Sequence, residues 1–284
     1  MVEVAEAIGL GHLAADERDV LAASSAGGGA LVRAALAAGA RRIVVGLGGS
    51  ATVDGGLGLL RALGCVLRDR DGGELHGTGA DLARLAAIDR SGLDPRLAAT
   101  PVLLALDVTS PLSGPDGAAP VFGPQKGATP EQVAELDAGL ARLGALLGEA
   151  AGIEGAGAAG GLGAALAWLG AEPRPGADVV MEETRFADAL AGAALCLTGE
   201  GSVDRQTAAG KTVARVIAAC RAREVPCAVI GGAVEPAAAD ALYALGAAAV
   251  VAAGGGPMSL EAALAHARGN VASSARALCG MLRG

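Results

Sequence analysis

The sequence predicts an α/β fold of two domains with mostly parallel sheets. Short apolar runs alternate with longer alanine-rich stretches, and glycine-rich segments separate them. This alternation is typical of parallel sheets, because each crossover between parallel strands needs a connection of helical length. A chain of 284 residues can bury a sizeable core. That core must be aliphatic, since the aromatic residues are limited to Trp168, Tyr243, Phe122 and Phe186.

Each predicted strand is a short apolar run, and each predicted helix is a longer, mostly alanine-rich stretch. The predicted strands span residues 41–46, 101–106, 193–199, 226–232 and 247–254. The predicted helices span residues 28–38, 57–63, 130–147, 162–169, 211–222 and 260–282. Thr129 as N-cap and Pro130 in the first turn mark the start of one of these helices. Two prolines within 170–179 predict a hinge between sub-domains 1–172 and 179–284.

The net charge and the spacing of the cysteines exclude some classes of function. The net charge is −8 and the basic residues are scattered among acids, which argues against nucleic acid as a partner. The five cysteines form no CxxC pair, a pattern typical of free thiols in a reducing cytosol. The opening MVEVAEAIGL lacks the features of a signal peptide, and no uncharged run is a convincing membrane span. We therefore expect a soluble cytoplasmic protein with no membrane partner.

The first stretch that could carry chemistry is VGLGGSATVDGG, residues 45–56, directly after a predicted strand. A glycine-rich loop between strand and helix exposes backbone N–H groups that can wrap an anion. Gly48 and Gly49 would supply such amides, while Ser50 and Thr52 would add hydroxyl donors. Asp54 could hold a metal ion or cap the following helix, and the residues alone leave both interpretations open.

The same loop also matches a weaker pattern, the dinucleotide fingerprint. Gly46, Gly48 and Ala51 fit its spacing, with Asp69 or Asp71 in the place of the ribose-binding acid. The residues that follow the loop break the smooth start of a helix that a dinucleotide fold needs. An NAD-dependent oxidoreductase therefore remains only a distant alternative.

The second stretch is LTGEGSVDRQTAAGKT, residues 197–212. Its GKT ending suggests a P-loop, but Arg205 stands where the Walker A motif requires glycine, so that interpretation fails on spacing. The expected loop still offers Glu200 and Asp204 as Mg²⁺ ligands or proton acceptors. Lys211 could neutralise a phosphate at the start of a helix. A capped helix with solvated charges is the alternative.

Two further stretches could also carry chemistry. Residues 106–132 place Asp107 at a strand end, and a long proline- and glycine-rich loop follows that contains Gln125 and Lys126. A loop of this length is usually functional or disordered, and Val121 and Phe122 favour order and hence function. Residues 155–166, GAGAAGGLGAAL, could serve either close helix packing or ligand binding.

Taken in order, these stretches resemble the type I glycerate kinase family. GLGGSATVDGG is similar to the family's GGSATNDGG, and residues 106–128 are similar to its CDVxNPLxGxxGAxxVFGPQKGA. TGEGSVDRQTAAGKT, GAGAAGGLGAAL and GPMSLEAAL also match. The resemblance runs from about Val2 to the end of the chain. It implies a two-domain fold and ATP-dependent phosphorylation of D-glycerate to 2-phosphoglycerate, with Mg²⁺.

The chain departs from the family pattern in three ways. Its start, VEVAEA, corresponds to a point well inside the family's fold, so we expect one domain to be incomplete at its N-terminal end and activity to be weakened. Val53 and Ser110 replace asparagines of the family's motifs, and Leu106 replaces a cysteine. The stretch AGGGA, residues 26–30, lacks the polar groups of the family's YGTGE. The alternative is a non-catalytic homologue that binds a nucleotide or an organic acid.

The resemblance and the residue chemistry together give a set of predicted site residues. The predicted catalytic residues are Asp107, Asp204, Lys126 and Lys211. The predicted nucleotide-binding residues are Gly48, Gly49, Ser50, Thr52, Gly199, Glu200 and Gly201. The predicted Mg²⁺ ligands are Asp54 and Asp204. The sequence does not assign which acid is the base, and it predicts no oligomeric state.

Overall fold

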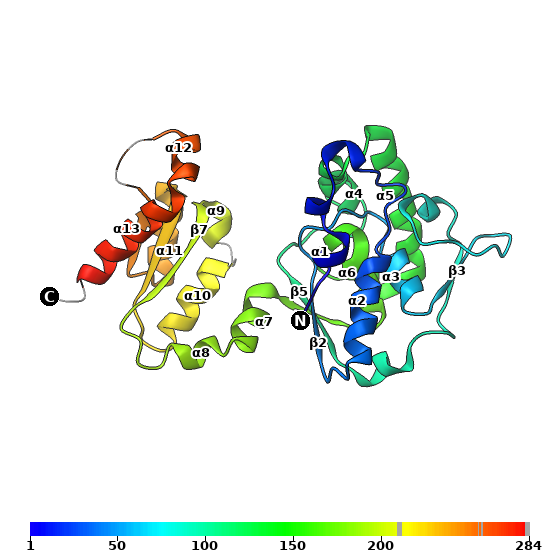
Figure 1. The fold of residues 1–284 in the computed structure, drawn as a ribbon, viewed down its shortest axis with the longest axis horizontal. Coiled ribbons are helices and arrows are strands. Elements are labelled where there is room, and N and C mark those ends of the chain that lie inside the picture. The colour runs from blue at the N-terminus through cyan, green and yellow to red at the C-terminus, as the bar shows by residue number, and fades with distance from the viewer. Residues whose placement is uncertain (209–211, 255, 257, 282–284) are drawn as a thin grey trace. The chain divides into compact units, whose positions relative to one another are not determined.

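The computed structural model describes residues 1–208, 212–254, 256 and 258–281. The chain forms two compact units, Met1–Gly176 and Ala177–Gly284, each built of helices around a parallel sheet. In Figure 1 the first unit runs from blue to green and the second from yellow-green to red. The predicted α/β class with mostly parallel sheets is confirmed. Among the described residues, no helix combines the length and apolarity needed to cross a bilayer.

The first unit is built on a four-stranded parallel sheet with the strand order β1-β2-β5-β6. The strands are β1 (Val2–Glu3), β2 (Ile43–Gly46), β5 (Val102–Leu106) and β6 (Glu172–Pro175). The central pair, β2 and β5, aligns Val45 with Leu104, and both side chains are fully buried. These two strands coincide with the apolar runs at 41–46 and 101–106, because a strand covered on both faces must be apolar throughout.

Strand β6 was not predicted, because its sequence EPRP looks like a linker. Pro173 and Pro175 have no N–H to donate, and a proline is tolerated in a sheet at an edge. β6 lies at the edge beside β5, where Leu104 pairs with Pro173. The segment 170–179 contains an edge strand followed by helix α7 (Gly176–Glu183), and the two units divide within it, after Gly176. The hinge and the sub-domain bounds 1–172 and 179–284 stay predictions.

The α-helices of the first unit build two apolar clusters, one of which contains the sheet. They are α1 (Ala5–Ile8), α2 (Ala26–Ala37), α3 (Leu57–Ala62), α4 (Ala118–Phe122), α5 (Pro130–Leu147) and α6 (Ala158–Trp168). Helix α5 starts where the sequence predicts, because Thr129 and Gln132 form a capping box and Pro130 occupies the first position. Leu136, Leu140 and Leu143 of α5 are buried in a second apolar cluster, separate from the one that covers the sheet.

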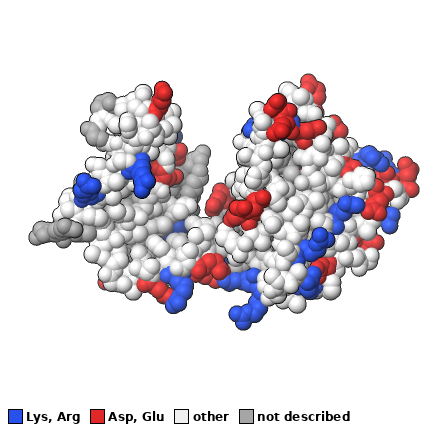
Figure 2. Space-filling model, viewed as in Figure 1, with Lys and Arg blue, Asp and Glu red and all other residues white. Residues whose placement is uncertain are grey.

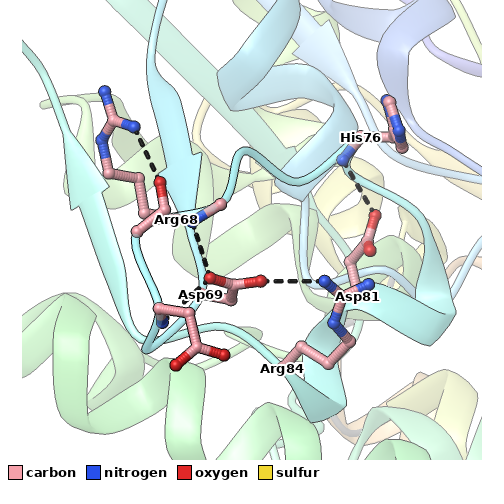
Figure 3. Close-up of polar contacts among 8 residues, drawn as sticks. Arg68, Asp69, His76, Asp81 and Arg84 are labelled. Atoms are coloured by element: carbon pink, nitrogen blue, oxygen red, sulfur yellow. Dashed lines mark hydrogen bonds and ion pairs between the residues drawn. The ribbon is translucent and has the colours of Figure 1, made fainter.

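A small antiparallel pair, β3 (Val66–Arg68) and β4 (Ala87–Asp89), adds to the first unit and was not predicted. Figure 3 shows the polar contacts that close the turn after β3. The Asp69 carboxylate accepts hydrogen bonds from the amides of Asp71 and Gly73 and pairs with Arg84 at 2.8 Å. Arg84 and these amides lower the pKa of Asp69. Asp69 therefore serves a surface turn, which removes the support for the dinucleotide interpretation.

The second unit has a three-stranded parallel sheet, β7 (Cys196–Val203), β8 (Cys227–Val234) and β9 (Ala249–Ala252). Its described helices are α8 (Phe186–Ala189), α9 (Arg205–Ala208), α10 (Thr212–Arg221), α11 (Pro236–Leu245), α12 (Leu260–Ala265) and α13 (Ala267–Gly280). One face of β8 packs on α10 and α11, and the other packs on Leu278 of α13. The prediction of one helix over 260–282 is wrong, since His266 separates α12 from α13.

On the face of the molecule that Figure 2 shows, acidic and basic side chains of the described residues are interspersed. This distribution agrees with the scattered basic residues of the sequence.

Two neighbouring glycines of α2 provide a test of the packing between α2 and α3. A Cβ at Gly29 would lie 2.7 Å from both the Ala62 Cβ and the Leu59 carbonyl oxygen, whereas a Cβ at Gly28 would meet nothing closer than 3.6 Å. We expect Gly29→Ala to lower the free energy of unfolding by about 1–3 kcal/mol through overpacking. We expect Gly28→Ala to be neutral or to raise it by up to about 1 kcal/mol, as alanine normally does in a helix.

Denaturant unfolding followed by Trp168 fluorescence measures this difference, because the only tryptophan of the chain lies in the first unit. Equal effects of the two substitutions would contradict the close approach of α2 and α3 at Gly29.

Candidate active site

A cavity of about 410 Å³ opens at the carboxyl ends of β2 and β5 in the first unit. This edge of a parallel sheet is where α/β proteins bind ligands. The walls come from Leu10 and from four segments, residues 47–50, 105–108, 122–126 and 158–159. The structure therefore brings together five of the predicted site residues: Gly48, Gly49, Ser50, Asp107 and Lys126.

The glycine-rich loop after β2 is fixed by backbone hydrogen bonds to the N-terminal region. Leu10 N–H donates to the Gly49 carbonyl at 2.7 Å, and Ala51 N–H donates to the Ile8 carbonyl at 2.8 Å. Gly49 has φ +69°, in the left-handed region where glycine is favoured. The loop is thus held in one conformation, with Gly48, Gly49 and Ser50 bordering the cavity.

The segment 155–166 supports this loop from behind and also lines the cavity. Gly160 and Gly161 have φ of 73° and 102°, and a Cβ on Gly160 would overlap the Thr52 carbonyl. The Gly55 N–H donates to the Gly160 carbonyl at 2.9 Å. Ala158 and Ala159 reach the cavity itself. Of the two interpretations left open by the sequence, backbone packing explains the glycines, while the neighbouring alanines form part of the wall.

Lys126 is a buried cation at the wall of the cavity, with 3% of its surface exposed. Its Nζ donates to the Ser50 hydroxyl at 3.1 Å and to the Thr52 carbonyl at 2.8 Å. An ammonium carries three N–H donors, so these two bonds leave one for an anionic ligand. Burial lowers the pKa of Lys126 to about 8, although the charge of Asp54 acts in the opposite direction.

Asp54 is fully buried, and its carboxylate caps the start of α3 by accepting from backbone amides there. One carboxylate oxygen accepts from the Ser25 amide and hydroxyl, both at 2.7 Å, and from the Gly58 amide at 3.1 Å. The other oxygen accepts from the Gly56 amide at 3.0 Å. Burial raises the pKa of Asp54, and the hydrogen bonds oppose that shift. Asp54 does not line the cavity, so the structure favours the helix-cap interpretation over the metal ligand.

Asp107 follows β5 directly and lines the cavity while remaining exposed. Its Oδ1 accepts a hydrogen bond from the Gly176 amide at 3.1 Å, which orients the carboxylate. A carboxylate accepts about four hydrogen bonds, so most of its capacity stays available to a ligand. Asp107 and Lys126 thus offer an acid and a cation at one cavity.

Thr52 belongs to the first unit, and its buried Oγ1 has no hydrogen-bond partner among the described residues. The other remaining predicted residues belong to the second unit. Gly199, Glu200 and Gly201 lie inside β7. The predicted strand ends at Gly199, so the loop expected from Glu200 onward is wrong as far as Val203. Glu200 Oε1 is buried and has no hydrogen-bond partner within the described part of the chain. Asp204 directly follows β7, and its N–H donates to Thr207 Oγ1 at 3.0 Å. Lys211 lies outside the described residues.

Sequence reasoning missed two residues that complete this region. Ser25 connects Asp54 with α3, because its hydroxyl donates to the carboxylate and accepts from the Leu59 amide at 2.9 Å. Leu10 forms part of the cavity wall. Neither residue belongs to a motif, so the sequence holds no signal for its role.

Comparison with known proteins identifies the family of the chain. The profile of the Glycerate kinase family matches residues 1–283. The chain belongs to that family. Glycerate kinase of Bacillus subtilis (strain 168) is 40% identical over 289 residues, which cover 100% of this chain and 75% of the relative. Glycerate 2-kinase of Escherichia coli (strain K12) is 44% identical over 216 residues, 74% of this chain and 57% of the relative.

A solved structure gives the same result for the fold. The crystal structure assigned to glycerate kinase 2 of Salmonella typhimurium LT2 has a TM-score of 0.82 and 42% sequence identity, and it covers 99% of this chain and 75% of the other. The predicted family and the predicted kinase that acts on glycerate are therefore confirmed. Membership in a glycerate kinase family implies ATP as the phosphoryl donor.

The burial of Lys126 predicts a specific pH dependence of stability. Its pKa is about 8 in the folded state against 10.5 unfolded, so the unfolded chain binds more protons between these values. Stability from this residue therefore rises as the pH rises from about 8 to 10.5. We expect the wild type to gain up to about 3 kcal/mol relative to Lys126→Met across this window.

Denaturant unfolding at several pH values, monitored through Trp168, measures the difference between the two proteins. The difference should stay constant from pH 6 to about pH 7, where Lys126 is protonated in both states. A difference that stays flat up to pH 10.5 would show that Lys126 keeps its ordinary pKa.

Proposed function

We propose that this chain transfers the γ-phosphoryl group of ATP to the 2-hydroxyl of D-glycerate, giving 2-phosphoglycerate, with Mg²⁺ as the metal. The observation that carries the proposal is that a buried cation, Lys126, and an available carboxylate, Asp107, line the same cavity. The cavity lies within the size range of small-molecule sites. Family membership supplies the reaction class.

Lys126 would neutralise negative charge in the substrates. Glycerate is an anion, and the transferred phosphoryl group gathers charge on its equatorial oxygens. A buried ammonium held by Ser50 and Thr52 requires little reorganisation when that charge arrives. The amides and hydroxyl of Gly48, Gly49 and Ser50 border the same cavity and would bind the glycerate carboxylate or a phosphate.

Asp107 would orient the 2-hydroxyl and accept its proton. In the proposed step the hydroxyl oxygen forms a bond to the γ-phosphorus, the bond to the β,γ-bridging oxygen breaks, and ADP leaves with that electron pair. The hydroxyl proton passes to the Asp107 carboxylate, which the Gly176 amide holds in place. A positioned acid or base of this kind typically contributes about 10²–10⁴-fold to the rate.

The second unit would hold Mg²⁺, and the residues there fit a hard divalent cation. The Glu200 Oε1 atom is a buried carboxylate oxygen to which no described residue donates a hydrogen bond. Asp204 lies four residues further on, directly after β7. Carboxylate oxygens are the ligands that Mg²⁺ prefers. When bound, Mg²⁺ neutralises charge on the β- and γ-phosphates. The roles of Gly199, Gly201 and Lys211 in nucleotide binding stay predictions.

Incubation of the purified chain with Mg·ATP and D-glycerate tests the function, with ³¹P NMR to separate 2-phosphoglycerate from 3-phosphoglycerate. L-glycerate serves as the control acceptor. Thermal stabilisation by Mg·ATP without turnover would favour the non-catalytic alternative, and stabilisation by NAD would favour the oxidoreductase.

Substitution of Asp107 tests the proposed base. Asp107→Asn keeps the size of the side chain and an oxygen for the Gly176 amide, but it cannot take the proton. We expect kcat to fall about 10²–10⁴-fold with little change in the KM for ATP.

Asp116→Asn is the matched control, because Asp116 is an exposed acid of the same 106–132 stretch that does not line the cavity. Its kinetics should equal those of the wild type. Retention of kcat within about threefold in Asp107→Asn would exclude Asp107 as the base.

Substitution of Glu200 tests the proposed metal site. Glu200→Gln removes the charge, so we expect the free Mg²⁺ concentration for half-maximal rate to rise about tenfold or more. Glu224→Gln is the control, since Glu224 is an exposed residue before the amino end of β8. An unchanged Mg²⁺ dependence in Glu200→Gln would remove Glu200 from the metal site.

A further inference from the structure

Three cysteines of the second unit meet in space, although their sequence spacing gives no sign of a site. Cys196 begins β7, Cys227 begins β8, and Cys220 lies in the last turn of α10. All three Sγ atoms lie within 4.8 Å of one another. Their thiols take no part in the proposed phosphoryl transfer. Each cysteine is free of disulfide bonds.

The fold brings these thiols together for a definite reason. Cys196 and Cys227 are direct partners in the parallel register of β7 and β8, so both side chains project from the same face of the sheet. Helix α10 packs on that face, and Ile217, Cys220 and Cys227 belong to the same apolar cluster. The Val225 N–H donates to the Cys220 carbonyl at 3.0 Å, which fixes the turn that leads from α10 to β8.

We propose that Cys196, Cys220 and Cys227 form a three-thiolate binding site for a soft, thiophilic metal ion such as Cu⁺ or Cd²⁺. Soft thiolate ligands select such ions. A metal–sulfur bond of about 2.3 Å places three sulfurs about 4.0 Å apart in a trigonal plane. The observed spacing therefore requires only a small contraction of the cluster.

The ligand set also determines which ions fit poorly. No imidazole or carboxylate of the described residues joins the three sulfurs. Zinc in proteins is almost always four-coordinate, so Zn²⁺ would need a water or another donor as its fourth ligand. Hard ions such as Mg²⁺ prefer oxygen and have no ligand here. The cluster is thus distinct in its chemistry from the proposed magnesium site on the far part of β7.

The buried thiols are protonated before an ion arrives. Burial raises the pKa of Cys227 to about 11, and burial together with the neighbouring thiols raises that of Cys220 further. Each thiol loses its proton as its sulfur binds the ion, so full coordination releases three protons and forms three metal–sulfur bonds without any change of oxidation state. Cys196 is only half-buried and provides the side from which an ion can enter.

An ion bound here would join β7, β8 and α10, so it should stabilise the second unit. Because it binds the folded chain and needs all three sulfurs at once, it should raise the unfolding temperature in a concentration-dependent way. β7 also carries Glu200 near its carboxyl end, so the ion would brace the strand that leads to the nucleotide-binding motif.

Titration of the full, reduced chain with Cd²⁺ under anaerobic conditions tests the proposal. We expect a thiolate-to-cadmium absorption band that saturates at one ion per chain, the release of three protons, and a higher unfolding temperature. Cys220→Ala should weaken Cd²⁺ binding at least about 100-fold, as expected when one of three ligands is lost.

Three further variants provide a second loss of a ligand and two controls. Cys196→Ala removes a half-buried thiol and should weaken binding similarly even if Cys220→Ala folds poorly. Cys279→Ala removes an exposed thiol and Cys65→Ala a buried thiol of the first unit, and both should bind as the wild type does. The proposal is overturned if Cys196→Ala still binds Cd²⁺ with wild-type affinity, if no band appears, or if mass spectrometry of the isolated chain shows a disulfide within the cluster.

Discussion

The candidate active site depends on the burial of one ammonium group, that of Lys126. Burying a cation is unfavourable unless hydrogen bonds and opposite charge compensate for lost hydration. Ser50 and the Thr52 carbonyl provide the hydrogen bonds, and Asp54 provides the opposite charge. Because each of these partners lies in the glycine-rich loop after β2, the same interactions that hold the lysine also hold the loop.

The Asp54 carboxylate fixes that loop from its other end. Its four donors come from Ser25 at the start of α2 and from the first turn of α3, so one buried acid joins two helices and the loop. Such a network is stable only when every buried member is satisfied, because an unpaired buried charge costs several kcal/mol. This requirement explains why Asp54, an acid inside the glycine-rich loop, caps a helix and does not line the cavity.

The sequence predicts those elements whose signals are local. Helix α5 has its capping box, its proline and its apolar spacing within one stretch, and its bounds at Pro130–Leu147 agree with the prediction. Strand β6 fails because its prolines normally exclude a strand, and only the position at the sheet edge permits them. The predicted strand over 193–199 is too short, because β7 continues to Val203 and a motif glycine such as Gly201 does not by itself distinguish a loop from a paired strand.

For the candidate site as well, the sequence predicts candidate residues but not the environment of their side chains. The motifs identify Asp107 and Lys126, which both follow β5 along the chain. Only the packed structure shows that they line one cavity together with the loop after β2, and that Lys126 is buried while Asp107 is exposed. A sequence records side-chain chemistry, whereas the protonation behaviour of a group is set by its surroundings. The protonation behaviour of Asp107 and Lys126 therefore depends on their environment, which the sequence does not record, as much as on their identity.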